Sequence, residues 1–258
     1  MADMNIQTAV VLAGGQGQRL RPMVADRPKP LADIAGRPFL THLLDFWIEQ
    51  GIHRFMLAVG YRWEMIAERL GDDYQGARID YTIESSPLGT GGGLLLALQQ
   101  LDWDDDRPVF VINGDTLFAV NARAMLTLHR KHQADLTLAC RRQPDSARFG
   151  VLTLDATDCV IEFSARSAPG ERWINGGVYL LERSLATTSP RPVALEQELI
   201  PGWLAAGHTV CAFRTDAFFI DIGIPEDYQR ARRLLPQRPW ASPFDQSSSN
   251  PPGRLHNV

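Results

Sequence analysis

Short apolar runs alternate with longer amphipathic stretches through the first half of the chain. The runs have the length of buried strands, and the stretches between them repeat apolar residues at helical spacing. The strand candidates are Ala9–Leu12, Phe55–Val59, Ile79–Ile83 and Val109–Ile112, and the helix candidates are Phe39–Gln50, Arg62–Leu70 and Thr90–Leu101. This alternation predicts a parallel sheet with helices on both faces, in which ligands bind at the carboxyl ends of the strands.

The second half of the chain has a different pattern. After a helix expected at Asn121–Gln133, several apolar segments follow one another with only loops between them. These strand candidates are Asp135–Ala139, Gly150–Leu154, Val160–Phe163 and Trp173–Leu181. Because parallel strands need long crossover connections, the sheet is expected to become mixed or antiparallel here. The pattern closes with a helix, two strands and a helix, expected at Leu195–Ala206, Thr209–Phe213, Phe218–Ile222 and Pro225–Leu235.

These patterns predict a single α/β domain over residues 1–235, with a mixed, mostly parallel central sheet and helices on both faces. Residues 236–258 are rich in proline and serine and bury little, so we expect them to form a disordered tail.

Composition narrows the class of partner. The chain has 258 residues with 45% hydrophobic content, and its net charge of −4 argues against binding to nucleic acid or to an anionic membrane. The first residues lack the basic and apolar regions of a signal peptide, and no apolar run approaches the ~20 residues that span a bilayer. A soluble, cytoplasmic protein is expected.

The cysteines and histidines give no metal signature in the sequence. Cys140, Cys159 and Cys211 are odd in number and lack a C-x-x-C spacing, so neither a disulfide framework nor a zinc site is indicated. We interpret them as buried thiols in a reducing cytosol. His129 and His132 share a face of the expected helix, but no third ligand lies near them in sequence.

The segment Leu12–Pro30, LAGGQGQRLRPMVADRPKP, predicts a phosphate site. Glycines directly after a buried strand let backbone N–H groups approach an anion without obstruction by a Cβ atom. Arg19 adds a planar fork of donors that matches phosphate oxygens, and Lys29 adds a compact charge between two prolines. The glycines are Gly14, Gly15 and Gly17.

Two common nucleotide motifs are excluded by spacing. A Rossmann fingerprint needs glycine at its sixth position, which is Arg19 when counted from Gly14 and Leu20 when counted from Gly15. A Walker A loop needs a Gly-Lys dipeptide, and the chain has none. A tight turn that binds nothing is the remaining alternative.

Two apolar strands stop at an aspartate. The segment VFVINGD ends at Asp115, and FFIDIGIPEDY places Asp221 before a turn and a helix. A carboxylate at the carboxyl end of a central strand suits Mg²⁺, which prefers one or two carboxylates together with phosphate oxygens. The two aspartates would share one ion if their strands are neighbours. The alternative for Asp115 is an Asx-turn after the strand.

The segment Glu84–Gly93, ESSPLGTGGG, joins an expected strand to an apolar helix. Its glycines allow close approach of a ligand near a helix N-terminus, so we predict that it forms the base-recognition side of a nucleotide pocket. A flexible linker is the alternative, and the apolar runs on both sides disfavour it.

Six ordered motifs over Thr8–Leu235 resemble those of the sugar-1-phosphate nucleotidylyltransferases. They are GGQGQRLRP, DRPKP, ESSPLGTGGG, NGD, INGGVY and DIGIPEDY. Within that family the chain is most similar to the guanylyltransferases that act on D-glycero-D-manno-heptose 1-phosphate, because of PLGTGG. It also resembles the uridylyltransferases for N-acetylmuramic acid 1-phosphate. The resemblance implies a Rossmann-like nucleotidyltransferase fold, with a nucleotide-binding half at about 1–120 and a sugar-binding half at about 121–235.

The resemblance also implies roles for single residues. The catalytic residues would be Arg19, Lys29 and Asp115, and Asp115 and Asp221 would bind Mg²⁺. The nucleotide-binding residues would be Leu12, Ala13, Gly14, Gly15, Gly17, Glu84, Pro87, Gly89 and Thr90. The sugar-phosphate-binding residues would be Asn113, Gly150, Arg166, Asn175 and Gly176. Family members are often dimers or tetramers, so the resemblance implies a homodimer or homotetramer.

One position departs from the family pattern. The family usually has Phe-x-Glu-Lys before the INGG motif, with both charged residues touching the sugar phosphate, whereas this chain has Phe163-Ser164-Ala165-Arg166. Arg166 still offers a cation to the phosphate, but Ala165 cannot accept a sugar hydroxyl. Glu162 alternates to the same side as Ser164 and is not a clear substitute. The departure weakens the assignment of the sugar, and N-acetylmuramic acid or mannose 1-phosphate remain alternatives.

The resemblance implies transfer of a nucleotidyl group from a nucleoside triphosphate to a sugar 1-phosphate, with release of pyrophosphate. Glu84 favours GTP, because a carboxylate only accepts hydrogen bonds and guanine offers two adjacent donors. Two other classes compete with this interpretation. One is a nucleotide-sugar-binding regulatory module without turnover, and the other is a glycosyltransferase, which would typically carry Asp-x-Asp where this chain has Asn113-Gly114-Asp115.

Overall fold

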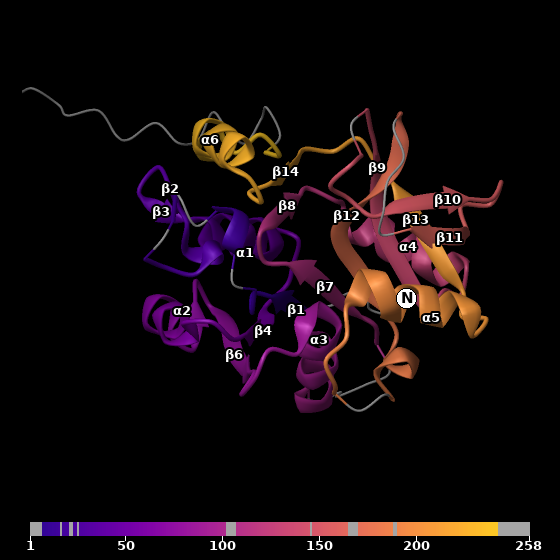
Figure 1. Ribbon diagram of the computed structural model, residues 1–258, viewed down its shortest axis with the longest axis horizontal. Helices are drawn as coiled ribbons and strands as arrows, with labels where there is room; N and C mark the ends of the chain where they lie inside the picture. Colours follow the sequence, from indigo (N-terminus) through magenta and orange to yellow (C-terminus); the bar gives the residue numbers. More distant parts are fainter. Residues whose placement is uncertain are drawn as a thin grey trace, which may run out of the picture.

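The computed structural model of the protein describes residues 7–241, except residues 16, 21–22, 25, 102–106, 145, 165–169 and 188–189, and the side chains of residues 18 and 187. Within this part of the chain, ten strands form one sheet whose main path runs β11-β10-β12-β7-β1-β4-β6-β5 (Figure 1). Two further small sheets, six α-helices and five short 3-10 or π-helical turns complete the described elements.

The first half of the chain builds the parallel part of the sheet. Its strands β1, β4, β6 and β7 pair in parallel, and a short strand β5 closes the edge in the antiparallel direction. Their bounds are Thr8–Leu12 for β1, Arg54–Val59 for β4, Asp73–Tyr74 for β5, Ala77–Ile83 for β6 and Val109–Asn113 for β7. Leu12 pairs with Ala58 on one side and Asn113 on the other, so the carboxyl ends of the strands meet at one edge.

The second half continues the sheet with antiparallel strands, as its short connections predict. β12 pairs antiparallel with β7, β9 and β10, β10 pairs antiparallel with β11, and β13 joins β9 in parallel. Their bounds are Leu136–Gln143 for β9, Val151–Leu154 for β10, Val160–Ser164 for β11, Arg172–Leu181 for β12 and Val210–Arg214 for β13. The predicted mixed, mostly parallel α/β fold is confirmed.

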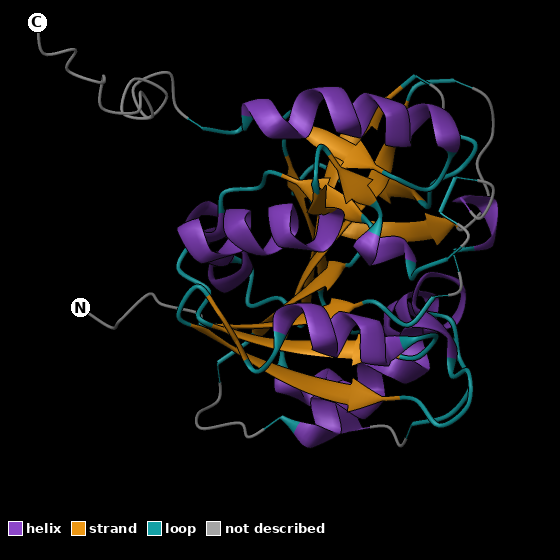
Figure 2. Cartoon of the chain, turned by 90° about the vertical axis from the view of Figure 1, so that its left-hand side faces the viewer, coloured by secondary structure: helices purple, strands orange, loops and turns teal. Residues whose placement is uncertain are grey.

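Helices cover both faces of the sheet (Figure 2). Neighbouring residues of β1 face opposite ways, so Val11 belongs to the apolar core on one face and Val10 to the core on the other. The first core includes residues of α1 (Phe39–Glu49), α2 (Trp63–Leu70), α4 (Ala122–Lys131) and α6 (Pro225–Leu234). The second includes residues of α3 (Gly89–Gln100) and α5 (Ile200–Ala205). Burial on both faces explains why the central strands are continuous apolar runs.

The predicted helix at Leu195–Ala206 consists of two parts. Residues Leu195–Leu199 form a π-helical turn, and α5 begins at Ile200. Pro201 has no backbone N–H to donate to the preceding turn, and the N–H group of Leu199 bonds to the carbonyl of Ala194, five residues earlier.

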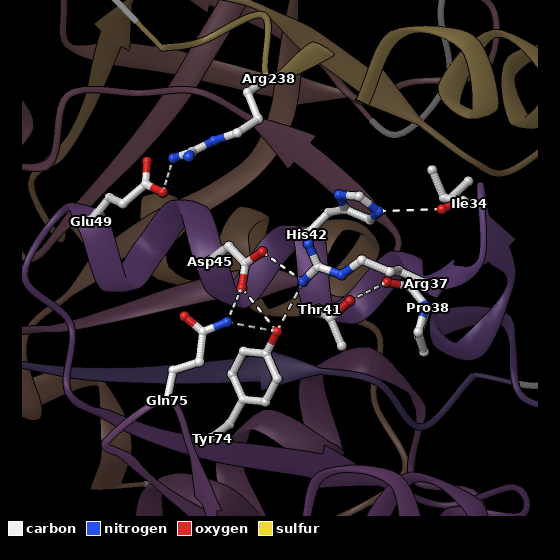
Figure 3. Close-up of polar contacts among 10 residues, drawn as sticks. All are labelled: Ile34, Arg37, Pro38, Thr41, His42, Asp45, Glu49, Tyr74, Gln75 and Arg238. Atoms are coloured by element: carbon white, nitrogen blue, oxygen red, sulfur yellow. Dashed lines mark hydrogen bonds and ion pairs between the residues drawn. The ribbon is translucent and has the colours of Figure 1, made fainter. Parts of the chain in front are cut away.

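Three short strands, at residues 33–34, 37–38 and 116–118, have no signature in the apolar pattern. A two-stranded hairpin consists of β2 (Asp33–Ile34) and β3 (Arg37–Pro38), and β8 (Thr116–Phe118) pairs with β14 (Phe219–Asp221) in a separate small sheet. Figure 3 shows how the hairpin and β5 are fixed to α1 through one carboxylate. Asp45 accepts hydrogen bonds from Arg37 at 2.7 Å, from the Tyr74 hydroxyl at 2.9 Å and from Gln75 at 2.9 Å.

The packed chain continues past the predicted end of the domain. The Arg238 guanidinium pairs with Glu49 on α1 (Figure 3), and the ring of Trp240 lies 6.0 Å from that of Phe46. The rest of the predicted tail, residues 242–258, lies outside the described residues. Among the helices that the structure does describe, none is both long enough and apolar enough to span a membrane.

The INGG motif of β12 forms a bulge between the part of β12 that pairs with β10 and the part that pairs with β7. Its register against β9 shifts between Asn175 and Tyr179. Gly177 has φ +69°, and a Cβ atom there would lie 2.6 Å from Nδ2 of Asn113. A Cβ atom on Gly176 would lie 2.2 Å from the ring of Phe118. Both glycines are therefore required for close packing of β12 against β7 and β8.

We expect Gly177→Ala to lower the free energy of unfolding by about 2 kcal/mol or more, because left-handed backbone strain and overpacking add at this position. Denaturant unfolding measures the change. Gly202→Ala in α5 is the control, since no heavy atom lies within 4 Å of an added Cβ there, and its stability should stay the same or rise by up to ~1 kcal/mol. Similar unfolding midpoints for the two variants would contradict this account of the motif.

Candidate functional site

A cleft with a volume of about 1120 Å³ opens at the carboxyl ends of β1, β4, β6 and β7. One wall comes from the loops that follow these strands, and the opposite wall comes from β12 and the turn before α5. The lining includes most of the sequence-predicted residues. These are Leu12, Ala13, Gly14, Gly15, Gly17, Arg19, Lys29, Glu84, Pro87, Gly89, Thr90, Asn113 and Asp115.

The glycine loop brings its backbone against two other parts of the site. Gly17 has φ +58°, and a Cβ atom there would lie 2.9 Å from Cβ of Lys29. A Cβ atom on Gly14 would lie 3.0 Å from a carboxylate oxygen of Glu84. Glycine is thus required at position 17 for its backbone conformation and for space, and at position 14 for space. Arg19 is exposed at the cleft lining.

Lys29 and two aspartates form the charged centre of the site. The Lys29 side chain is only 10% exposed, and its Nζ donates a hydrogen bond to Oδ2 of Asp115 at 2.6 Å. The Thr116 hydroxyl lies 3.2 Å from Oδ1 of Asp115 and 3.0 Å from Oδ2 of Asp221. Thr116 therefore lies between the two carboxylates.

The small sheet of β8 and β14 is what brings the second aspartate to the first. Asp221 ends β14 and is the register partner of Thr116 at the start of β8. The N–H group of Ile222 then bonds to the carbonyl of Asp115 at 3.0 Å. The sequence-based condition for a shared ion is that the strands ending at Asp115 and Asp221 are neighbours. Instead β14, which lies within the expected strand Phe218–Ile222, pairs with β8, a short strand that follows Asp115 and has no signature in the apolar pattern.

The two carboxylates titrate differently. At Asp115, burial is outweighed by the charge and hydrogen bond of Lys29, which hold the pKa of this carboxyl below its usual value. At Asp221, burial and the negative charge of Asp115 raise the pKa. One ammonium group thus serves two carboxylates, and a further cation would be needed to stabilise both as anions. The potential metal ligands here are carboxylate and hydroxyl oxygens, which fit a hard divalent ion such as Mg²⁺.

The loop after β6 forms another part of the wall. Glu84 Oε2 accepts a hydrogen bond from the Leu88 N–H group at 2.9 Å, and burial raises the pKa of Glu84. A Cβ atom on Gly93 would lie 2.4 Å from Glu84 Oε1. The hydroxyl of Thr90 accepts a hydrogen bond from the N–H group of Leu195 at 3.0 Å, which joins this loop to the opposite wall.

Sequence reasoning missed the carboxyl group on that opposite wall. Glu196 lines the cleft beside Tyr179, and its Oε1 lies 2.8 Å from Nδ2 of Asn175 and 3.3 Å from the Tyr179 hydroxyl. Burial raises the pKa of Glu196, and no lysine or arginine contacts it among the described residues. Nothing in the segment LEQEL distinguishes Glu196 from Glu198, since only tertiary packing turns one of them toward the cleft.

Three of the residues predicted to contact the sugar lie behind the wall. Asn175 is buried with 4% exposure and donates to Glu196, and its N–H group bonds to the carbonyl of Gly150 at 2.8 Å. Gly176 packs on the ring of Phe118. None of Gly150, Asn175 and Gly176 is among the residues that line the cleft, and Asn175 supports Glu196 from behind through its hydrogen bond. Arg166 and Ala165 lie outside the described residues.

Comparison with known proteins agrees with this architecture. The D-glycero-alpha-D-manno-heptose 1-phosphate guanylyltransferase of Aneurinibacillus thermoaerophilus is 39% identical over 230 residues, which are 88% of this chain and 97% of that protein. The mannose-1-phosphate guanylyltransferase of Mycobacterium tuberculosis is 38% identical over 227 residues, which are 86% of this chain and 62% of that protein.

A solved structure, HddC from Yersinia pseudotuberculosis complexed with GMP-PN, has a TM-score of 0.76 at 32% identity and covers 88% of this chain and 98% of its own. The family model described as nucleotidyl transferase matches residues 8–238, and the resemblance carried by the six motifs is confirmed. The chain therefore belongs to the nucleotidyl transferase family.

Proposed function

We propose that the chain transfers a GMP group from GTP to a sugar 1-phosphate, and that D-glycero-D-manno-heptose 1-phosphate is its best acceptor. The observation that carries this proposal is the cleft in which Lys29 and Asp115 lie beside a glycine loop at the ends of β1 and β7. The relative named for that heptose phosphate supports the acceptor. The mannose relative, at 38% identity, makes mannose 1-phosphate the second candidate.

The reaction needs no nucleophile from the protein. A phosphate monoester has a second pKa near ~6, so a sugar 1-phosphate is largely dianionic at neutral pH. One of its oxygens forms a bond to the α-phosphorus of GTP, the bond to the bridging oxygen breaks, and pyrophosphate leaves with the electron pair. The protein must hold two polyanions in line and stabilise the charge that develops.

Two basic side chains and a divalent ion would supply the positive charge for this task. Arg19 and Lys29 would bind the triphosphate, and Asp115 and Asp221 would hold Mg²⁺, which neutralises phosphate oxygens when bound. The Lys29 ammonium would bind a phosphate oxygen beside the carboxylate that would hold the ion. The hydrogen bond of 2.6 Å between Lys29 and Asp115 supports a role for both residues at the same phosphate.

Glu84 is the residue that we assign to the base. Its carboxylate lines the cleft and could accept hydrogen bonds from N1–H and the 2-amino group of guanine. Uracil and thymine present one donor flanked by carbonyl oxygens that repel a second carboxylate oxygen. The bond from the Leu88 N–H group fixes the orientation of Glu84 before the nucleotide binds.

Glu196 is the residue that we assign to the sugar. The family glutamate that would accept a sugar hydroxyl is replaced by Ala165 in this chain, so a carboxylate must come from elsewhere. Glu196 lies on the cleft wall that the second half of the chain builds, and Asn175 and Tyr179 fix its orientation. Holding a buried carboxyl without a cation is costly, which is typical of a binding site rather than of a structural position.

A panel of four nucleoside triphosphates against the 1-phosphates of heptose, mannose, glucose and N-acetylmuramic acid tests the proposal. With Mg²⁺ present, GTP and the heptose phosphate should release pyrophosphate fastest, and the reverse reaction should proceed at a comparable rate. Lys29→Met should lower turnover at least about 100-fold, because a transition-state cation is lost. Arg123→Met, an exposed change on α4, is the control. Absence of pyrophosphate release in every pairing would overturn the proposal.

We expect Glu84→Gln to lower the preference for GTP over UTP by about tenfold or more, measured as the ratio of kcat/KM values. Glutamine keeps an acceptor for the Leu88 N–H group but offers guanine a donor in place of an acceptor. Glu68→Gln on the exposed face of α2 is the matched control. A wild-type protein that uses UTP as well as GTP contradicts the assignment of Glu84 to the base.

We expect Glu196→Gln to raise KM for the sugar phosphate about tenfold while KM for GTP changes little. The variant should also unfold at a higher temperature at neutral pH, because the raised pKa of Glu196 makes its ionised form destabilising. This penalty is complete above the folded-state pKa and vanishes below the ordinary glutamate pKa of about 4.3, where both states are protonated. The control is Glu198→Gln in the same turn, and equal effects of the two variants would refute the role.

A further inference from the structure

A second group of ligand-type side chains gathers away from the cleft. His132 follows the last turn of α4, Cys159 precedes β11, and Cys211 lies on β13. Cys159 and Cys211 face each other across an isolated antiparallel bridge. None of the three lines the cleft, and none is used by the proposed reaction.

The spacing of these atoms matches a tetrahedral metal site. The two sulfur atoms are 3.9 Å apart, and a zinc–sulfur bond of about 2.3 Å in a tetrahedron places two sulfurs about 3.8 Å apart. One ligand atom from each of His132, Cys159 and Cys211 lies within 4.8 Å of the other two. A disulfide needs the sulfurs at about 2.05 Å, so the two cysteines are free thiols.

The turn that carries Cys159 is held by its own hydrogen bonds. Asp155 Oδ1 accepts hydrogen bonds from the N–H groups of Cys159 at 2.9 Å and Thr157 at 2.8 Å. The N–H group of Ala212 bonds to the carbonyl of Asp158 at 2.8 Å, which fixes the turn against β13. Asp155 also lies within electrostatic range of both His132 and Cys211. The backbone that carries Cys159 is thus held in place beside Cys211.

We propose that His132, Cys159 and Cys211 bind one zinc ion, with solvent in the fourth position. Two thiolates and an imidazole are the donors that zinc favours. The ion would join the end of α4 to the turn before β11 and to β13, and so stabilise the outer part of the antiparallel half. Because the ligands come from three separate segments, and the two cysteines are 52 positions apart, the site has no compact sequence motif.

Cobalt(II), which reports thiolate ligands by its colour, is the probe for this site. The reduced full-length protein is titrated with Co²⁺ in excess Mg²⁺, which occupies the oxygen ligands of the cleft. We expect one ion per chain, a thiolate-to-cobalt charge-transfer band and tetrahedral ligand-field bands, all displaced by stoichiometric Zn²⁺. Zinc should also raise the unfolding temperature by several degrees over protein in chelator.

Paired variants decide between this site and adventitious binding. Cys159→Ser and Cys211→Ser should abolish the charge-transfer band, and His132→Ala should weaken Co²⁺ binding at least about tenfold. Cys140→Ala and His53→Ala, which change the same residue types elsewhere, should bind Co²⁺ like the wild type. Lys29→Met should keep the band, which separates this inference from the proposed function. A band that survives Cys159→Ser, no band at stoichiometric Co²⁺, or a Cys159–Cys211 disulfide in protein purified without reductant would overturn the proposal.

Discussion

The ion pair between Lys29 and Asp115 is the interaction on which the site depends. The Lys29 side chain is only 10% exposed and its ammonium group lies 2.6 Å from the Asp115 carboxylate, and this cation holds the pKa of that carboxyl below its usual value. Asp221 lies beyond Thr116 with its pKa raised by burial and by the charge of Asp115. The centre is therefore short of one positive charge before a polyanion arrives, which is the electrostatic reason for a divalent ion in a phosphate site.

The sheet places these groups by two different kinds of pairing. Parallel strands with aligned carboxyl ends bring the glycine loop after β1 next to the aspartate after β7. The antiparallel pair of β8 and β14 then brings Asp221 to Thr116, which is 105 residues away in the chain. Parallel pairing alone would build half of the charged centre, and the short second sheet supplies the other half.

The sequence predicts the elements that have a local apolar pattern and the site residues that directly follow an apolar strand. The long elements, the mixed sheet and the cleft-lining glycines and charges of the first half follow from periodicity and from the position of residues at strand ends. It predicts a strand at Phe218–Ile222, within which β14 lies, but it does not predict β8, because a three-residue strand has no pattern of its own and forms only by pairing with β14. Nor does it predict the place of Glu196, whose orientation is set by Asn175 and Tyr179. Motif resemblance assigned Asn175 and Gly176 to the sugar, where packing places them behind the wall.

The two recognition walls of the cleft are also fixed to one another. The loop that carries Glu84 is joined to the opposite wall by the bond between Thr90 and Leu195, and the N–H group of Gly91 bonds to the carbonyl of Val193 at 3.0 Å. Leu195 is the residue before Glu196, so the loop that carries Glu84 is hydrogen-bonded to the segment that carries Glu196. A glycine is required at position 91 because a Cβ atom would lie 2.8 Å from Leu199 and 3.0 Å from that segment. The glycine-rich stretch after Glu84 therefore also fixes one wall of the cleft against the other.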